Sequence, residues 1–179
     1  MKIVATNIGE KRVVNWKGSV LETGIFKFPV AAIFLGDEDV EKDAVIDRRY
    51  HGGIENAVYA YNTDHYEYWQ KMFPDLEWNY GMFGENLSIE GLDESKIHIG
   101  SSYKVGDAII EVTKPREPCV KLGMRFNDAT MIKKFWKTNK SGMYFKVLQN
   151  GKVTAGDLVE IIEEKRENKT IAEAYEALK

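Results

Sequence analysis

The only cysteine of the chain stands in a stiff, cationic segment. Cys119 follows Pro115 and Pro118, whose rings fix the backbone and favour extended geometry in the residues before them. Residues 114–125 hold one anion, Glu117, and four cations: Lys114, Arg116, Lys121 and Arg125. Because nearby positive charge favours the thiolate, Cys119 is a candidate nucleophile or metal ligand. The alternative is a buried, inert cysteine, a common fate of a free thiol.

A second segment that could do chemistry covers residues 47–53, where Arg48 and Arg49 precede His51-Gly52-Gly53. Arginine side chains carry fork-shaped donors suited to phosphate or carboxylate. The two glycines allow backbone N–H groups to converge on an anion. The segment therefore predicts an anion-binding loop, although a glycine turn beside two solvated arginines would account for the same residues.

The third segment covers residues 81–87, where two glycines bracket Phe83 and two polar residues lead into a strand. Asn86 offers both hydrogen-bond donors and an acceptor, which is what the edge of a heterocyclic ring requires. The alternative is a simple turn in which Asn86 bonds to its own backbone.

These segments need a scaffold, and short strand-like runs separated by turns such as Lys17-Gly18 dominate the chain. The expected strands cover residues 4–8, 11–16, 19–26, 57–61, 97–99, 103–105, 108–112, 142–149 and 158–162. Helices are expected over residues 64–73, from 127 or 128 to 137, and over 170–178. Many short strands with glycine or aspartate turns favour a mainly β barrel or sandwich.

Composition narrows the class of protein. A length of 179 residues fits one domain, with or without a short appendage. The formal net charge of -3 argues against a nucleic-acid partner, which would need a basic excess. A single cysteine excludes an intrachain disulfide and fits a reducing compartment. Since we find neither a signal peptide nor an apolar run of about 20 residues, we expect a cytoplasmic protein without a membrane partner.

Two of the histidines and a cluster of aromatic residues are expected to have structural roles. His51, His65 and His98 lack the paired spacing of a zinc site. We expect His65 on a helix surface and His98 on a strand. We expect the aromatic cluster of residues 59–69 in the core: Tyr59, Tyr61, Tyr66, Tyr68 and Trp69.

Taken together and in this order, the three segments resemble one family. Residues 47–61, 83–87 and 115–119 are similar to the MOSC domain, the C-terminal domain of molybdenum cofactor sulfurases and its stand-alone relatives. The resemblance is to the bacterial stand-alone type linked to detoxification of 6-hydroxylaminopurine. It covers residues 1–163 and leaves residues 164–179 as a short C-terminal helical tail. It implies a MOSC-type β-barrel with a few peripheral α-helices.

The resemblance also implies a molybdenum cofactor, a pterin dithiolene with a phosphate arm. Cys119 is then the expected ligand of the metal and the catalytic residue. The other expected cofactor-binding residues are Arg48, Arg49, His51, Gly52 and Gly53 for the phosphate or pterin, and Asn86 and Arg116 for the pterin edge. Pyridoxal phosphate is not expected, because no lysine stands in a recognisable Schiff-base context.

The implied activity is reduction of N-hydroxylated compounds such as hydroxylamino purines, with electrons from an external reductase. Two alternatives stay open: a non-catalytic carrier or sulfur-delivery module for the cofactor, and a metal-free thiol enzyme in which His51 activates Cys119. The chain departs from the family pattern at Glu55-Asn56, where many relatives carry an acidic residue and a lysine. One cation of the expected pocket is therefore missing.

Overall fold

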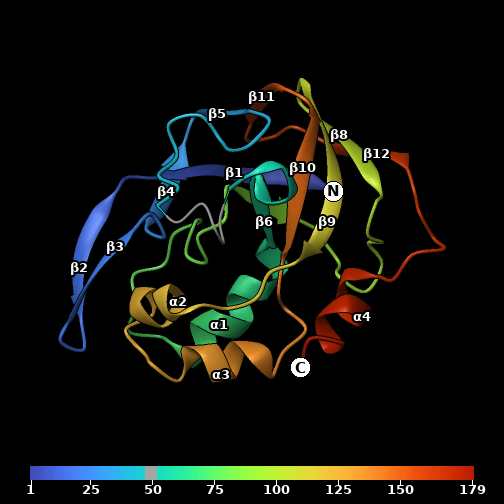
Figure 1. Cartoon of the computed structure of the whole chain (residues 1–179). Coiled ribbons are helices and arrows are strands. Elements are labelled where there is room, and N and C mark those ends of the chain that lie inside the picture. The colour runs from blue at the N-terminus through green and yellow to red at the C-terminus, as the bar shows by residue number, and fades with distance from the viewer. Residues whose placement is uncertain (47–51) are drawn as a thin grey trace.

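A computed structural model describes residues 1–46 and 52–179, and Figure 1 shows its elements in chain order. The strands are β1 (Lys2–Gly9), β2 (Arg12–Trp16), β3 (Ser19–Thr23), β4 (Lys27–Val30), β5 (Ala32–Leu35), β6 (Val58–Asn62), β7 (Leu87–Glu90), β8 (Ser102–Val105), β9 (Ala108–Pro115), β10 (Met143–Gln149), β11 (Gly151–Thr154) and β12 (Val159–Glu163). The helices are α1 (Tyr66–Met72), α2 (Val120–Arg125), α3 (Met131–Trp136) and α4 (Ile171–Glu176), with the 3-10 turns η1 (Ile54–Asn56) and η2 (Thr63–His65).

One curled sheet dominates the molecule. Its eight strands run in the order β12-β8-β9-β10-β6-β7-β1-β4, and β6 and β7 form its parallel pair. The first half of β1 meets the segment before β12 through three backbone bonds: Ile3 N–H to Asp157 O at 2.9 Å, Gly156 N–H to Ile3 O at 2.8 Å, and Val159 N–H to Met1 O at 3.0 Å. We call this junction the seam. It joins the two ends of the curled sheet through these few bonds rather than through a complete ladder of paired strand residues. The mainly β, barrel-like prediction is confirmed.

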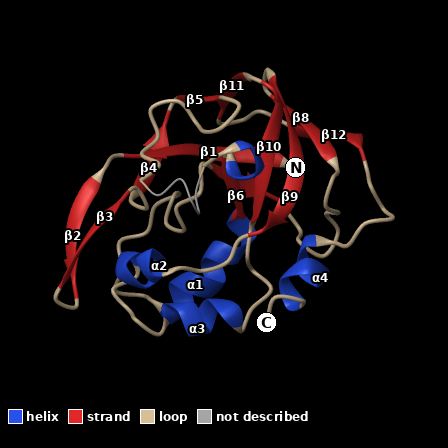
Figure 2. Ribbon diagram, viewed as in Figure 1, coloured by secondary structure: helices blue, strands red, loops and turns tan. Residues whose placement is uncertain are grey.

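The core has two parts. Aliphatic side chains such as Val58, Ile89 and Ile110 fill the interior of the curl. Aromatic side chains fill the space between the sheet and the helices, where Tyr61 stacks on Phe83 at 4.0 Å between ring centroids. Figure 2 shows most of the strands in one half of the molecule and the α-helices in the other, while the β2–β3 hairpin reaches down beside the helices. The aromatic layer therefore ties the helical half to the face of the sheet.

Local sequence signals explain α1 and α4. The side chain of Asn62 accepts the Asp64 N–H at 3.0 Å and starts the turn that leads into α1. At α4, Thr170 and Glu173 form a reciprocal capping box, which satisfies two backbone donors at once. Both predicted helices are confirmed.

Helices α2 and α3 differ from expectation. Helix α2 was not predicted, since it spans six residues and its first cap, Cys119, makes no side-chain capping bond. Helix α3 begins at Met131 instead of at 127 or 128. The reason is that Asp128 uses its carboxylate to accept the Thr130 N–H at 2.8 Å, which builds a turn before the helix.

The structure also tests the predicted hairpin, one predicted strand and the predicted core position of the aromatic cluster. The hairpin at Lys17-Gly18 is confirmed, with φ of 51° and 81° at its two turn residues. The strand over 97–99 is wrong, because only His98 pairs there, as an isolated bridge to Thr170. Of the aromatic cluster, Tyr68 is 41% exposed and lies outside the core. No helix within the described residues is long and apolar enough to cross a membrane.

Candidate functional site

A cleft opens beside the curled sheet and contains about 610 Å³ of space free of protein atoms, part of it open to solvent. Segments far apart in the sequence line it. They are residues 23–25, 43–46 and 56–57 with Lys27, Gly52, Tyr59, Gly84, Asn86, Arg116, Cys119, Lys121 and Tyr144. Each of the three segments singled out in the sequence therefore contributes to one cleft wall.

Cys119 is held between a strand and a helix. Strand β9 ends at the buried Pro115, and Cys119 takes the cap position of α2 in an extended conformation, with φ of -124° and ψ of 170°. Its carbonyl accepts the Leu122 N–H at 2.9 Å, while the residue itself is half-buried on the cleft wall. A thiol anchored from both sides in this way has a fixed position and remains accessible from the cleft.

Arg116 is buried behind Cys119. Its guanidinium donates from Nη1 to the carbonyl of Phe83 and lies over the ring of Tyr59, with 4.7 Å between Cζ and the ring centroid. Burial works against the charge, but the electrostatic influence of Tyr59, Tyr144 and Cys119 outweighs it and raises the pKa of Arg116. The arginine therefore supplies a permanent positive charge to the cleft.

Tyr59 and Tyr144 form the aromatic part of the same wall, with 5.2 Å between their ring centroids. Burial raises the pKa of both phenols well away from neutral pH, and Arg116 only partly opposes this effect. Both hydroxyls thus stay protonated. The Tyr59 hydroxyl donates to the carbonyl of Ser141 at 2.8 Å, which fixes the ring under the guanidinium.

Glu85 organises the segment that carries Asn86. Its fully buried carboxylate accepts the hydroxyl of Tyr66, the N–H groups of Gly81 at 2.8 Å and Phe83 at 3.0 Å, and the hydroxyl of Ser88 at 2.9 Å. Desolvation raises the pKa of Glu85, although these donors pull the other way. The carboxylate acts as an internal template around which residues 81–86 fold.

Asn86 joins three segments at the cleft wall. Its Nδ2 donates to Asp43 Oδ2 at 2.8 Å and to the Asn7 carbonyl at 3.3 Å, and its Oδ1 lies 3.4 Å from the Tyr59 nitrogen. The bond to its own backbone considered from the sequence is therefore not how Asn86 is held. These contacts are long-range and position the wall, while contact with a ligand stays a prediction.

Asp43 and Lys27 are cleft residues that sequence reasoning missed. Lys27 Nζ donates to Asp43 Oδ2, and Asp43 Oδ1 accepts the Gly9 N–H at 2.9 Å. Their side chains are only 10% and 3% exposed, so this is a buried ion pair. Nothing in the local sequence distinguishes these two residues from solvated charges, because the pair forms only when β4 and the 43–46 segment pack together.

Gly52 and Gly53, the double glycine of the second segment, both lie within the described residues. Gly52 lines the cleft with φ of 76°, and a Cβ there would lie 2.9 Å from a methyl of Val45. The N–H of Gly53 donates to the carbonyl of Glu38 at 2.8 Å. This N–H is thus engaged within the chain rather than turned to an anion. Arg48, Arg49 and His51 lie outside the described residues, and their roles stay predictions.

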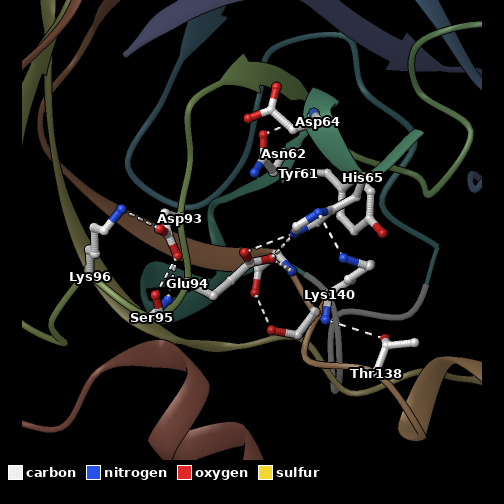
Figure 3. A network of polar contacts seen from close by, with 12 residues as sticks. Tyr61, Asn62, Asp64, His65, Asp93, Glu94, Ser95, Lys96, Thr138 and Lys140 are labelled. Atoms are coloured by element: carbon white, nitrogen blue, oxygen red, sulfur yellow. Dashed lines mark hydrogen bonds and ion pairs between the residues drawn. The ribbon is translucent and has the colours of Figure 1, made fainter. Parts of the chain in front are cut away.

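Behind the cleft lies a polar network around His65, shown in Figure 3. His65 Nε2 lies 2.9 Å from Glu94 Oε2, while Lys140 Nζ lies 3.4 Å from His65 Nδ1. Since an ammonium group only donates, this arrangement fits the tautomer that carries its proton on Nε2. The expected surface position of His65 is wrong, because its side chain is only 14% exposed.

The network is connected to the cleft through β10. Glu94 Oε1 accepts the Gly142 N–H at 3.0 Å, next to the Ser141 carbonyl that receives the Tyr59 hydroxyl. Gly142 has φ of 63°, and a Cβ there would lie 2.4 Å from the Ala60 carbonyl. Glu94 and Tyr59 therefore hold the start of β10 from two sides.

Two buried polar atoms of the cleft residues lack a partner among the described residues, and they are complementary. They are Arg116 Nε, a donor, and Asn56 Oδ1, an acceptor. Buried polar groups normally find a hydrogen-bond partner, so each is a place for a ligand atom. A pterin edge carries both donors and acceptors, and a thiolate suits a soft metal centre. The residues present thus fit a molybdenum cofactor.

Comparison with known proteins agrees with this fold. The MOSC domain family model matches residues 47–160, which covers more than half of the chain. The protein belongs to the MOSC domain family, which is associated with the molybdenum cofactor.

Three relatives illustrate the relationship. The chain is 35% identical to the uncharacterized protein YflK of Bacillus subtilis over 161 residues, 89% of this chain and 72% of that one. It is 37% identical to a protein named reductase from Gibberella moniliformis over 133 residues, 72% of this chain and 22% of that one. The crystal structure of YiiM from Geobacillus stearothermophilus superposes with a TM-score of 0.81 at 30% identity, covering 99% of this chain and 83% of that one.

Proposed function

We propose that the protein binds the molybdenum cofactor in this cleft and reduces N-hydroxylated compounds such as hydroxylamino purines. The observation that carries the proposal is the convergence of an accessible thiol, Cys119, with two unpaired buried polar atoms of opposite character on Arg116 and Asn56. Membership of the MOSC family and the likeness to a protein named reductase support it.

Each residue has a role in the proposal. Cys119 would ligate the metal through Sγ, and Arg116 Nε and Asn56 Oδ1 would hold the pterin edge. Lys121, on the cleft wall two residues after Cys119, would face the negative charge of the phosphate arm. Arg48, Arg49, His51 and the backbone of Gly52 and Gly53 are proposed for the same arm, and Asn86 for the pterin edge. When bound, the cofactor supplies a two-electron metal centre able to accept oxygen.

The proposed reaction breaks the N–O bond of a hydroxylamine, consumes two electrons and two protons, and releases an amine and water. The electrons are proposed to come from an external reductase. The chain matches only 22% of the Gibberella protein named reductase, so most of that protein lies outside the shared part. We also propose a reducing, cytoplasmic compartment, in which a single thiol stays available as a ligand.

The test is metal and pterin analysis of protein made in a host that synthesises the cofactor. We expect about one molybdenum per chain in the wild type, and loss of metal with Cys119→Ala. Wild-type protein without molybdenum or pterin would refute the proposal. Turnover separates an enzyme from a carrier: loaded protein with dithionite-reduced methyl viologen should convert a hydroxylamino purine to the amine. Loaded protein that fails to do so would instead be a carrier or sulfur-delivery module.

The proposal also includes the domain boundaries of the chain. We propose residues 1–163 as the MOSC unit and residues 164–179 as its helical tail. The tail packs firmly, because Ile171 and Tyr175 of α4 are fully buried and Tyr175 stacks on Trp136 at 4.9 Å between ring centroids. It therefore stabilises the unit while remaining outside the cleft.

A further inference from the structure

Two arginines from distant parts of the chain share one pair of aromatic rings. Cζ of Arg12, on β2, lies 5.3 Å from the ring centroid of Phe26 and 5.2 Å from that of Phe28. Cζ of Arg125, at the end of α2, lies 5.0 Å and 5.8 Å from the same two centroids. The rings thus hold two like charges, the arginine pair, in one place.

The guanidinium of Arg125 is fixed in advance. Its Nη2 donates to Asn79 Oδ1 at 3.1 Å, and Asn79 in turn donates to the Lys27 carbonyl at 3.2 Å. Its Nε is buried and has no partner among the described residues. Burial and the nearby charge of Arg12 lower the pKa of Arg125, although Glu85 and Tyr66 partly oppose them. The side chain therefore has donor capacity that the protein does not use.

No carboxylate among the described residues forms an ion pair with either member of the arginine pair. Two cations placed together without a directly paired carboxylate repel each other, so an incoming anion would relieve this repulsion. Preorganised guanidinium groups lose little freedom when they bind carboxylate. The surface is therefore suited to carboxylates.

The setting of the pair favours a protein partner. Phe28 is 41% exposed beside the two charges, and Val120, in the helix that leads to Arg125, is 50% exposed. Arginine with exposed aromatic area is typical of protein interfaces. The whole chain carries a formal net charge of -3, so this cationic surface differs in sign from the chain average and would attract an acidic partner locally. That contrast would select one docking orientation.

The position of the arginine pair relative to Cys119 indicates why a partner protein would bind there. Helix α2 starts directly after Cys119 and ends at Arg125, six residues later, which is about 9 Å along the helix axis. Figure 1 shows α2 on the same side of the molecule as the β2–β3 hairpin that carries Arg12. A partner seated on the arginine pair would thus stand close to the thiol.

We propose that Arg12 and Arg125, with Phe28, form the docking surface for an acidic electron-carrier protein that delivers electrons to the cleft. This inference rests on the proposed function, because it assumes that electrons enter the site beside Cys119. The carboxylates of the carrier bind the two guanidinium groups, and its apolar surface covers Phe28.

The test measures binding of two acidic electron carriers, a plant-type [2Fe–2S] ferredoxin and a flavodoxin. Basic cytochrome c, which carries the opposite charge, is the negative control. We expect the acidic carriers to bind and to weaken as salt is raised, and cytochrome c not to bind. Arg12→Glu should raise the Kd for the acidic carriers about tenfold, because it reverses a charge at the interface. Arg125→Gln removes the charge and keeps a polar side chain, and it should raise the Kd about threefold.

Lys152→Glu is the matched control, since it reverses an exposed charge on β11, in the strand-rich half of the molecule away from α2. Unchanged thermal melting shows that each variant is folded. Equal binding by wild type, Arg12→Glu and Lys152→Glu overturns the docking surface, as does absence of binding by both acidic carriers.

Turnover distinguishes this failure from that of the proposed function. If viologen drives turnover in every variant and the acidic carriers fail only with Arg12→Glu and Arg125→Gln, both proposals stand. If the carriers drive all variants equally, the docking surface is refuted and the proposed function survives. If loaded protein is inactive even with viologen, the proposed function falls, and the binding result decides the docking surface by itself.

Discussion

Replacing Glu85, the buried carboxylate around which residues 81–86 fold, should cost a large part of the protein's stability. The carboxylate is fully buried and accepts four hydrogen bonds. In Glu85→Ala the hydroxyls of Tyr66 and Ser88 can turn to other acceptors, but the N–H groups of Gly81 and Phe83 cannot. A buried donor left without a partner costs about 2 kcal/mol, so we expect a loss of about 4 kcal/mol.

Glu85→Gln provides the matched comparison. An amide oxygen placed at Oε1 keeps the contacts with Tyr66, Gly81 and Ser88, whereas the amide nitrogen then faces the N–H of Phe83. One donor facing another costs about 2 kcal/mol, and removal of a buried charge offsets part of this. Glu85→Gln should therefore lose less than half of what Glu85→Ala loses.

The assay is urea unfolding followed by tryptophan fluorescence, with the midpoint and the slope fitted separately. The reasoning requires lower midpoints at unchanged slope, in the order wild type, Glu85→Gln, Glu85→Ala. A stability of Glu85→Ala within about 0.5 kcal/mol of wild type would refute the template role, because surface substitutions typically fall in that range. Equal losses in the two variants would refute the assumption that Glu85→Ala leaves two N–H donors unpaired and Glu85→Gln only one.

Three further predictions follow from the same geometry. Burial raises the pKa of Glu85 from 4.5, so the folded state holds this proton more tightly. The contribution of Glu85 to stability is complete below pH 4.5 and is lost as pH rises through the folded-state pKa. Because other groups titrate in both proteins, the measurement is the difference in urea midpoint between wild type and Glu85→Gln across pH, which should move against wild type as pH rises. Gly142→Ala should destabilise by about 3 kcal/mol, because φ is 63° and the new Cβ would lie 2.4 Å from the Ala60 carbonyl; an unshifted melting temperature would contradict this. Tyr175→Ala should cost about 4 kcal/mol by emptying the fully buried space beside Trp136, with altered tryptophan emission as the readout and Leu178→Ala, at an exposed position, as the control.

Features that depend on nearby residues were predictable. The Lys17-Gly18 turn, the Asn62 cap and the Thr170–Glu173 capping box each involve residues within a few positions of one another, so their chemistry is visible in the sequence. Cys119 was also recognisable, because its prolines and cations are local. The structure places it on the cleft wall, and its role as a metal ligand stays a prediction.

Features that depend on distant residues were not predictable. The Lys27–Asp43 pair and the Asn86–Asp43 bond exist only because β4, the 43–46 segment and the 81–86 segment meet in the folded chain. His65 was misplaced for the same reason, since its partner Glu94 is 29 residues away and buries the imidazole. A charged side chain in a single sequence is most simply read as solvated, and only a specific distant partner changes that.

The seam has a consequence for how the chain is made. Residues 1–3 are synthesised long before their backbone partners at 156–159. Until those partners emerge, the start of β1 has an open edge on a growing ribosomal product, and such edges are prone to pair with other chains. The curl can close only after residues 156–159 have left the ribosome, so we expect closure of the seam to follow synthesis of the other strands of the sheet.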